Sequence, residues 1–130
     1  MKAKTLLATT AFLCSFSVLA DANEASFNAL CTSCHSTQGS SGIAPPAFGV
    51  VSHTKEVYPS RETFVQRVVD WVANPNADEA LMPGAVNKFG VMPKLGYPED
   101  QVRAAANYLF DADLTRPQGH GQGHGKGQGH

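Results

Sequence analysis

The chain has 130 residues, of which 42% are hydrophobic and 16% are charged, a composition typical of one small globular domain. Its formal net charge is −1, and from residue 21 onward eight Lys and Arg face eleven Asp and Glu, a net of −3. This balance argues against nucleic-acid binding, which needs a basic patch with interleaved aromatic residues, and favours partners with a positive docking face.

The first twenty residues have the pattern of a secretory signal peptide. Lys2 and Lys4 form a basic start, residues 6–19 form an apolar stretch, and small residues surround Ala20 and Ala22. We expect cleavage after one of these two alanines. The apolar stretch is too short to predict a membrane span, and no other segment reaches eighteen apolar residues. The mature chain is therefore expected in the periplasm, without a transmembrane helix.

Residues 23–34 predict a short helix that ends in a cysteine motif. Phe27 lies one turn before Cys31, so the two side chains should share a face. The motif reads Cys31-Thr32-Ser33-Cys34-His35, and it holds the only cysteines of the mature chain. A Cys-x-x-Cys-His sequence is typical of covalent haem attachment, because two thiols on one turn can join one haem and the next imidazole can bind its iron.

Two other interpretations of the cysteine pair are a redox-active dithiol and half of a zinc site. A thioredoxin-like dithiol follows a βαβ pattern, and a zinc site needs a second pair of ligands. The sequence contains neither, so haem attachment is the favoured interpretation.

A Ser- and Gly-rich loop follows, and then a rigid extended segment over residues 42–49 that contains Pro45 and Pro46. A histidine that binds a metal usually donates its other ring N–H to a backbone carbonyl or a carboxylate. The carbonyl of either proline is a candidate acceptor for His35.

The clearest helical pattern spans residues 60–74, and a short helical turn is predicted over residues 77–81. The last helix is predicted over residues 98–110, with Pro98 at its first position. Three helices and no convincing strand indicate an all-α domain. The apolar residues that recur at helical spacing are Phe64, Val68, Trp71 and Val72 in the middle helix, and Val102, Ala105, Ala106 and Leu109 in the last.

The tail over residues 117–130 consists mostly of Gly, Gln and His and cannot enter a core, so it is expected to be disordered. His120, His124 and His130 could bind Ni, Cu or Zn there, and a purely solubilising tail is the equal alternative. The folded domain is then expected over residues 21–116.

Over residues 23–112 the order of these features resembles the class I c-type cytochromes. The resemblance implies a cytochrome c fold in which three main helices wrap around one covalently bound haem. It also implies an axial methionine sixteen or seventeen positions before the tyrosine of the last helix. Met92 lies sixteen positions before Tyr108, whereas Met82 lies twenty-six before it. Met92 is therefore the expected iron ligand opposite His35.

The same resemblance places Phe27 and Tyr108 where the first and last helices cross. It places the carbonyl that accepts from His35 at Pro45 or Pro46. The family often has a glycine near the start of the first helix, where this chain has Asn23.

The function that these features predict is electron transport by a periplasmic carrier that is not an enzyme and that exchanges electrons with redox protein partners. The alternative is a haem enzyme or sensor with a labile distal methionine. His53 is the only other histidine in the domain, so the sequence offers no acid–base cluster for such chemistry.

Overall fold

The computed structural model describes residues 15–39 and 42–114. Within these ranges the chain is helical and contains no strand, which confirms the all-α prediction. None of the described helices is both long enough and apolar enough to cross a membrane. The helices in chain order are α1 (Ser15–Leu30), α2 (Ala47–Val57), α3 (Arg61–Ala73), the 3₁₀-helix η1 (Ala77–Glu79), α4 (Pro83–Phe89) and α5 (Glu99–Asp111).

Helix α1 begins eight residues before the start predicted from the sequence and ends four residues earlier. It extends toward the N-terminus because residues 15–22 contain neither glycine nor proline, and nothing there ends a helix. Both candidate cleavage positions, after Ala20 and after Ala22, lie inside α1. Beyond Leu30 the chain continues in a turn, with the amide of Cys31 donating to the carbonyl of Phe27 at 2.9 Å.

Helices α3 and α5 lie where the sequence pattern predicts them, to within one residue. Ser60 caps the start of α3, because its hydroxyl accepts a hydrogen bond from the amide of Thr63 at 3.2 Å. Asn74, directly before a proline, ends that helix. In α5 the N-cap is Pro98, so the proline stands just before the helix and not at its first position.

Two helices, α2 and α4, were not predicted, and both begin at a proline. Pro46 is the N-cap of α2, and Pro83 is the first residue of α4. Pro46 falls in the segment that the sequence predicts to be extended, but the first turn of a helix needs no amide hydrogen bond and suits the fixed φ of proline. The extended segment predicted over residues 42–49 therefore ends at Pro46.

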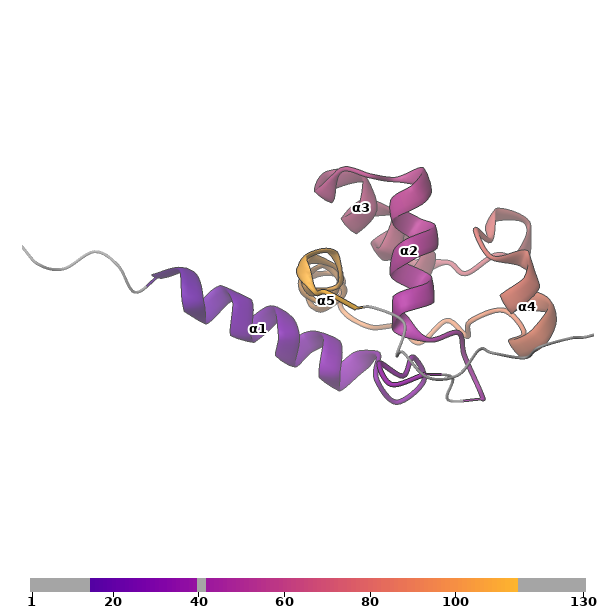
Figure 1. Ribbon diagram of the computed structural model, residues 1–130, viewed down its shortest axis with the longest axis horizontal. Helices are drawn as coiled ribbons and strands as arrows, with labels where there is room; N and C mark the ends of the chain where they lie inside the picture. Colours follow the sequence, from indigo (N-terminus) through magenta and orange to yellow (C-terminus); the bar gives the residue numbers. More distant parts are fainter. Residues whose placement is uncertain (1–14, 40–41, 115–130) are drawn as a thin grey trace, which may run out of the picture.

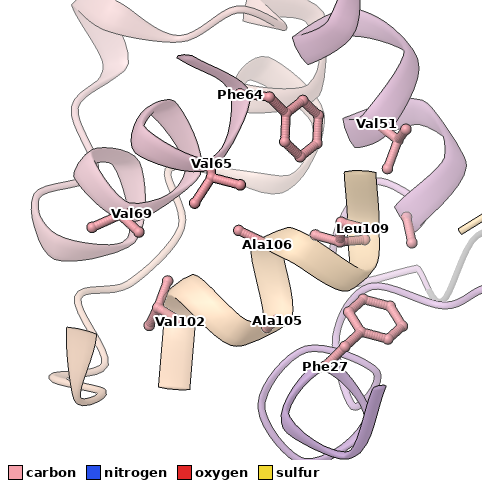
Figure 2. Packing of buried hydrophobic residues seen from close by; sticks show 10 residues of the cluster. Phe27, Val51, Phe64, Val65, Val69, Val102, Ala105, Ala106 and Leu109 are labelled. Carbon is pink, nitrogen blue, oxygen red and sulfur yellow. The ribbon is translucent and has the colours of Figure 1, made fainter. Parts of the chain in front are cut away.

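Helix α5 forms the centre of the fold and packs between α1 and α3 (Figure 1). Phe27 from α1 and Phe64 from α3 are the two largest fully buried side chains. In Figure 2, Ala105 lies on the side of α5 nearer Phe27, and Ala106 lies on the side nearer Val65 of α3. Small residues on both sides of α5 let the three helices approach closely, so they determine the packing distance.

We expect Ala106→Leu to lower the free energy of unfolding by about 1–3 kcal/mol, because Ala106 is fully buried and added methylenes have no space. Urea denaturation measures the change. The matched control is Gln101→Leu, an exposed position on the same helix. Equal stability of the two variants would contradict the packing described for α5.

Three charged side chains connect α2, α3 and the end of α5. The ammonium group of Lys55 donates to the carbonyl of Phe110 at 2.8 Å, and Arg61 forms a two-armed ion pair with Asp111. The hydrogen bond from Arg61 lowers the pKa of Asp111. Both side chains of the ion pair are about half exposed, so the pair contributes less than about 1 kcal/mol to the stability of the fold. Its main effect is to orient the ends of α3 and α5 relative to each other.

Candidate functional site

A cavity of about 250 Å³ lies among the end of α1, helices α2 to α5 and the segment between α4 and α5. Its wall is mostly aliphatic and aromatic, and it is partly open to solvent. This volume is slightly below the range typical of ligand pockets, about 300–1,000 Å³. All five α-helices contribute to the wall, so the cavity depends on the complete fold.

The cysteine motif forms a tight turn on the wall of this cavity. The amides of Cys34 and His35 both donate to the carbonyl of Cys31, at 3.2 and 2.8 Å. This turn brings the side chains of Cys31, Cys34 and His35 to the same cavity. No disulfide joins the two cysteines. The three residues that the sequence motif predicts to act together are therefore adjacent in space.

The imidazole of His35 is held by the backbone of Pro45. Its Nδ1 atom lies 2.8 Å from the carbonyl oxygen of Pro45. Because a carbonyl oxygen can only accept, Nδ1 is the donor, and in the neutral imidazole Nε2 then keeps its lone pair. Of the two candidate prolines, Pro45 is thus the partner, whereas the carbonyl of Pro46 accepts from the amides of Gly49 and Val50 in the first turn of α2. The hydrogen bond orients the ring and leaves one nitrogen available as a ligand.

The thiol of Cys31 lies in an apolar environment, and burial raises its pKa to about 11, with a further contribution from the nearby Cys34. Phe27, one turn earlier on α1, is 1% exposed and lines the same cavity. The Cys31 thiol is therefore protonated at neutral pH.

In the folded chain without cofactor, we expect Cys31 to react with iodoacetamide at about pH 8 at least ~10-fold more slowly than in urea. The raised pKa lowers the fraction of reactive thiolate, which outweighs the higher nucleophilicity of the more basic thiol. Mass spectrometry of the peptide that carries Cys31 measures the rate. The Cys34→Ser variant is the control for competing modification, and equal rates with and without urea would contradict the burial of Cys31.

Both methionines considered as ligands line the cavity, and both are half-buried. Met82 is the N-cap of α4, and its carbonyl accepts from the amides of Ala85 and Val86 at 3.0 and 3.1 Å. Met92 lies in the non-helical segment between α4 and α5. The cavity therefore does not distinguish the two thioethers, and the preference for Met92 depends on its spacing from α5.

The segment around Met92 is bracketed by two glycines with positive φ, Gly90 at +82° and Gly96 at +69°. Other residues are strained in this conformation. The two glycines turn the chain out of α4 and again before α5, so that the residues between them lie along the cavity.

The sequence patterns did not identify Arg67, the only charged side chain in the described part of the cavity wall. Its guanidinium lies 5.3 Å from the ring centroid of Trp71, which also lines the cavity, and donates to the carbonyl of Glu79 at 2.5 Å. No ion pair within the described residues involves Arg67. Arg67 and Trp71 are four residues apart on one helix, and this spacing could have predicted that the two side chains lie on the same face of α3. Thr54, the one buried polar residue described, also lines the cavity.

Of the remaining candidates among the described residues, Phe27 lines the cavity, whereas Tyr108 and His53 do not. The ring centroids of Phe27 and Tyr108 are 5.1 Å apart, so these aromatic residues stack where α1 and α5 pack. His53 is exposed, lies 3.5 Å from the carboxylate of Glu56, and does not line the cavity. The described residues contain no group of three or more His, Cys, Asp or Glu that could hold a metal ion. The tail histidines, His120, His124 and His130, lie outside the described residues.

Comparison of the chain with protein-family models, with curated proteins and with solved structures finds no match in any of the three.

Proposed function

We propose that this protein is an exported electron carrier of the cytochrome c type, with one haem bound covalently through Cys31 and Cys34. The observation that carries the proposal is the arrangement at the cavity. Two thiols and an imidazole share one turn, and the hydrogen bond from His35 to Pro45 leaves the other ring nitrogen available for a metal. The proposal includes that the protein is located in the periplasm, which is inferred from the signal-peptide pattern of residues 1–20.

The residues present fit a covalently bound haem in their donor chemistry. The thiols of Cys31 and Cys34 are soft nucleophiles on the wall of an apolar cavity, so each could form a thioether with a vinyl group. His35 would bind the iron through Nε2, and Met92 would bind it with its thioether sulfur. When bound, haem supplies a one-electron change at iron between the ferrous and ferric states.

The chain's own residues have three tasks in this function. His35, oriented by Pro45, and Met92 would hold the iron in both oxidation states, so that little would reorganise on electron transfer. The mostly apolar wall would limit access of water to a bound haem and disfavour the additional positive charge of the ferric state, which would raise the reduction potential. Arg67, which lines the cavity, would supply a positive charge for the carboxylates of a bound haem.

An enzyme or sensor with a labile methionine has less support. Among the described residues the cavity wall contains no carboxylate and no histidine other than His35. Acid–base catalysis at this site would need such a group within hydrogen-bond reach. Electron transfer needs no acid–base group, which agrees with a cavity wall that contains no carboxylate among the described residues.

The test is the intact mass and visible spectrum of the protein after export in a host that attaches haem. We expect a mass one haem above that of the polypeptide beginning at Asp21 or Asn23. We also expect colour that stays with the polypeptide after acid–organic extraction. The oxidised protein should show the weak far-red band of sulfur-to-iron charge transfer. A polypeptide without haem, or haem released by extraction, would overturn the proposal.

A further inference from the structure

Thr54 is the one buried polar residue among those described, and its hydroxyl has no partner. The residue is 6% exposed and lines the cavity. No hydrogen bond joins its hydroxyl to any of the described residues. Burial of a hydroxyl without a hydrogen bond costs free energy, and a valine of the same shape would avoid that cost.

The usual local solution for a hydroxyl in a helix is absent at Thr54. A serine or threonine in a helix can donate to the carbonyl four residues earlier. Ser26 does so in α1, where its hydroxyl donates to the carbonyl of Ala22 at 2.9 Å. Thr54 lies inside α2, and the carbonyl of Val50 would be the equivalent acceptor, but no such bond forms. The hydroxyl is therefore left for a partner outside its own helix.

The hydroxyl of Thr54 is not sealed in the core. Among the described residues, every fully enclosed side-chain nitrogen or oxygen atom has a hydrogen-bond partner. An unpartnered hydroxyl must then be accessible, and the open space that Thr54 contacts is the cavity. Ala47 and Val50 line the same cavity, and their spacing from Thr54 places all three on one face of α2. Thr54 is thus the polar position in an otherwise apolar stripe.

We propose that Thr54 helps to set the reduction potential of the haem, as a hydroxyl that faces the cavity and can turn either end of its dipole toward it. The inference rests on the proposed function. A hydroxyl hydrogen rotates freely, so the oxygen can face the cavity when the iron is ferric and carries the additional positive charge. Polarity near a haem favours the ferric state and lowers the potential. Thr54 therefore opposes the effect of the apolar wall around it.

The test compares Thr54→Val with Thr54→Ser in the exported, haem-loaded protein. Valine keeps the shape and removes the hydroxyl, whereas serine keeps the hydroxyl. At a fixed mediator potential, we expect the ratio of ferrous to ferric protein to rise about three- to tenfold in Thr54→Val, where tenfold corresponds to about 59 mV for one electron. In Thr54→Ser the ratio should stay within about twofold of that of the unchanged chain.

The matched control is Ser52→Ala, on the same helix. Ser52 is exposed, and its hydroxyl donates to the carbonyl of Gly49 at 3.2 Å. This variant should leave the ratio of ferrous to ferric protein unchanged. The far-red sulfur-to-iron band should persist in all three variants, because none of them removes an expected ligand.

Urea denaturation of the same proteins reports on the hydroxyl whether or not haem is bound. Because Thr54 makes no hydrogen bond within the fold, the unfolding equilibrium constant of Thr54→Val should stay within about twofold of that of the unchanged chain. Loss of an internal hydrogen bond would raise this constant about fivefold.

The proposal is overturned if Thr54→Val keeps the original ratio of ferrous to ferric protein, or if Thr54→Ser shifts it as much as Thr54→Val does. It is also overturned if Thr54→Val loses the far-red band, or if it unfolds as a chain that has lost an internal hydrogen bond. A protein that carries no haem overturns both the proposed function and this inference. Equal potentials in haem-loaded proteins overturn this inference alone.

Discussion

Replacing both Cys31 and Cys34 with alanine is expected to abolish covalent haem attachment completely. Cys31 and Cys34 are the only cysteines after residue 14, and both line the same cavity, so no other thiol in that part of the chain can form a thioether with haem. The intact mass should fall to that of the polypeptide alone, and acid–organic extraction should leave it colourless. Each single variant should keep one thioether, with an absorption maximum at longer wavelength because one vinyl group stays conjugated.

The matched control is Ser33→Ala, an exposed position on the same turn. It should keep both the added mass and the spectrum. Haem that remains attached in the double alanine variant would show that the cysteines have another role, and the haem proposal in its present form would be wrong. Mass is measured on the denatured chain, so the result does not depend on whether the variant folds.

Met92→Ala is expected to remove the far-red sulfur-to-iron band and to lower the reduction potential by on the order of 0.1 V, within the range that axial ligands set. Loss of the thioether would also let added imidazole or carbon monoxide bind the iron of the haem-loaded protein. The physical reason is that a thioether favours ferrous iron, so its removal destabilises the reduced state. Spectroscopy and a redox titration of the haem-loaded protein measure both effects.

Met82→Ala is the matched control, because Met82 lines the same cavity and is also half-buried. It should keep the far-red band and resist added ligands. If Met82→Ala lost the band and Met92→Ala kept it, the spacing from Tyr108 would have identified the wrong methionine. This pair of variants tests which methionine binds the iron. The cavity geometry does not decide this, because both thioethers lie on its wall.

Helix bounds were predicted most accurately where all local signals in the sequence indicated the same structure. The periodicity of α3, with a serine cap before it and a proline after Asn74, placed that helix to within one residue. Helices α2 and α4 were missed because proline has two opposite meanings. It disrupts regular structure in the interior of a helix, yet it suits the first turn, and only the residues that pack after it decide which applies.

By itself the sequence determined the all-α class, the grouping of Cys31, Cys34 and His35 on one turn and the apolar stripe of α5, because these depend on residues within a few positions of each other. Only the tertiary structure decided that Pro45, and not Pro46, accepts from His35, that Arg67 lies on the cavity wall and that Met82 shares the wall with Met92. Contacts between distant segments depend on how the helices pack around α5, and sequence periodicity carries no information about that arrangement.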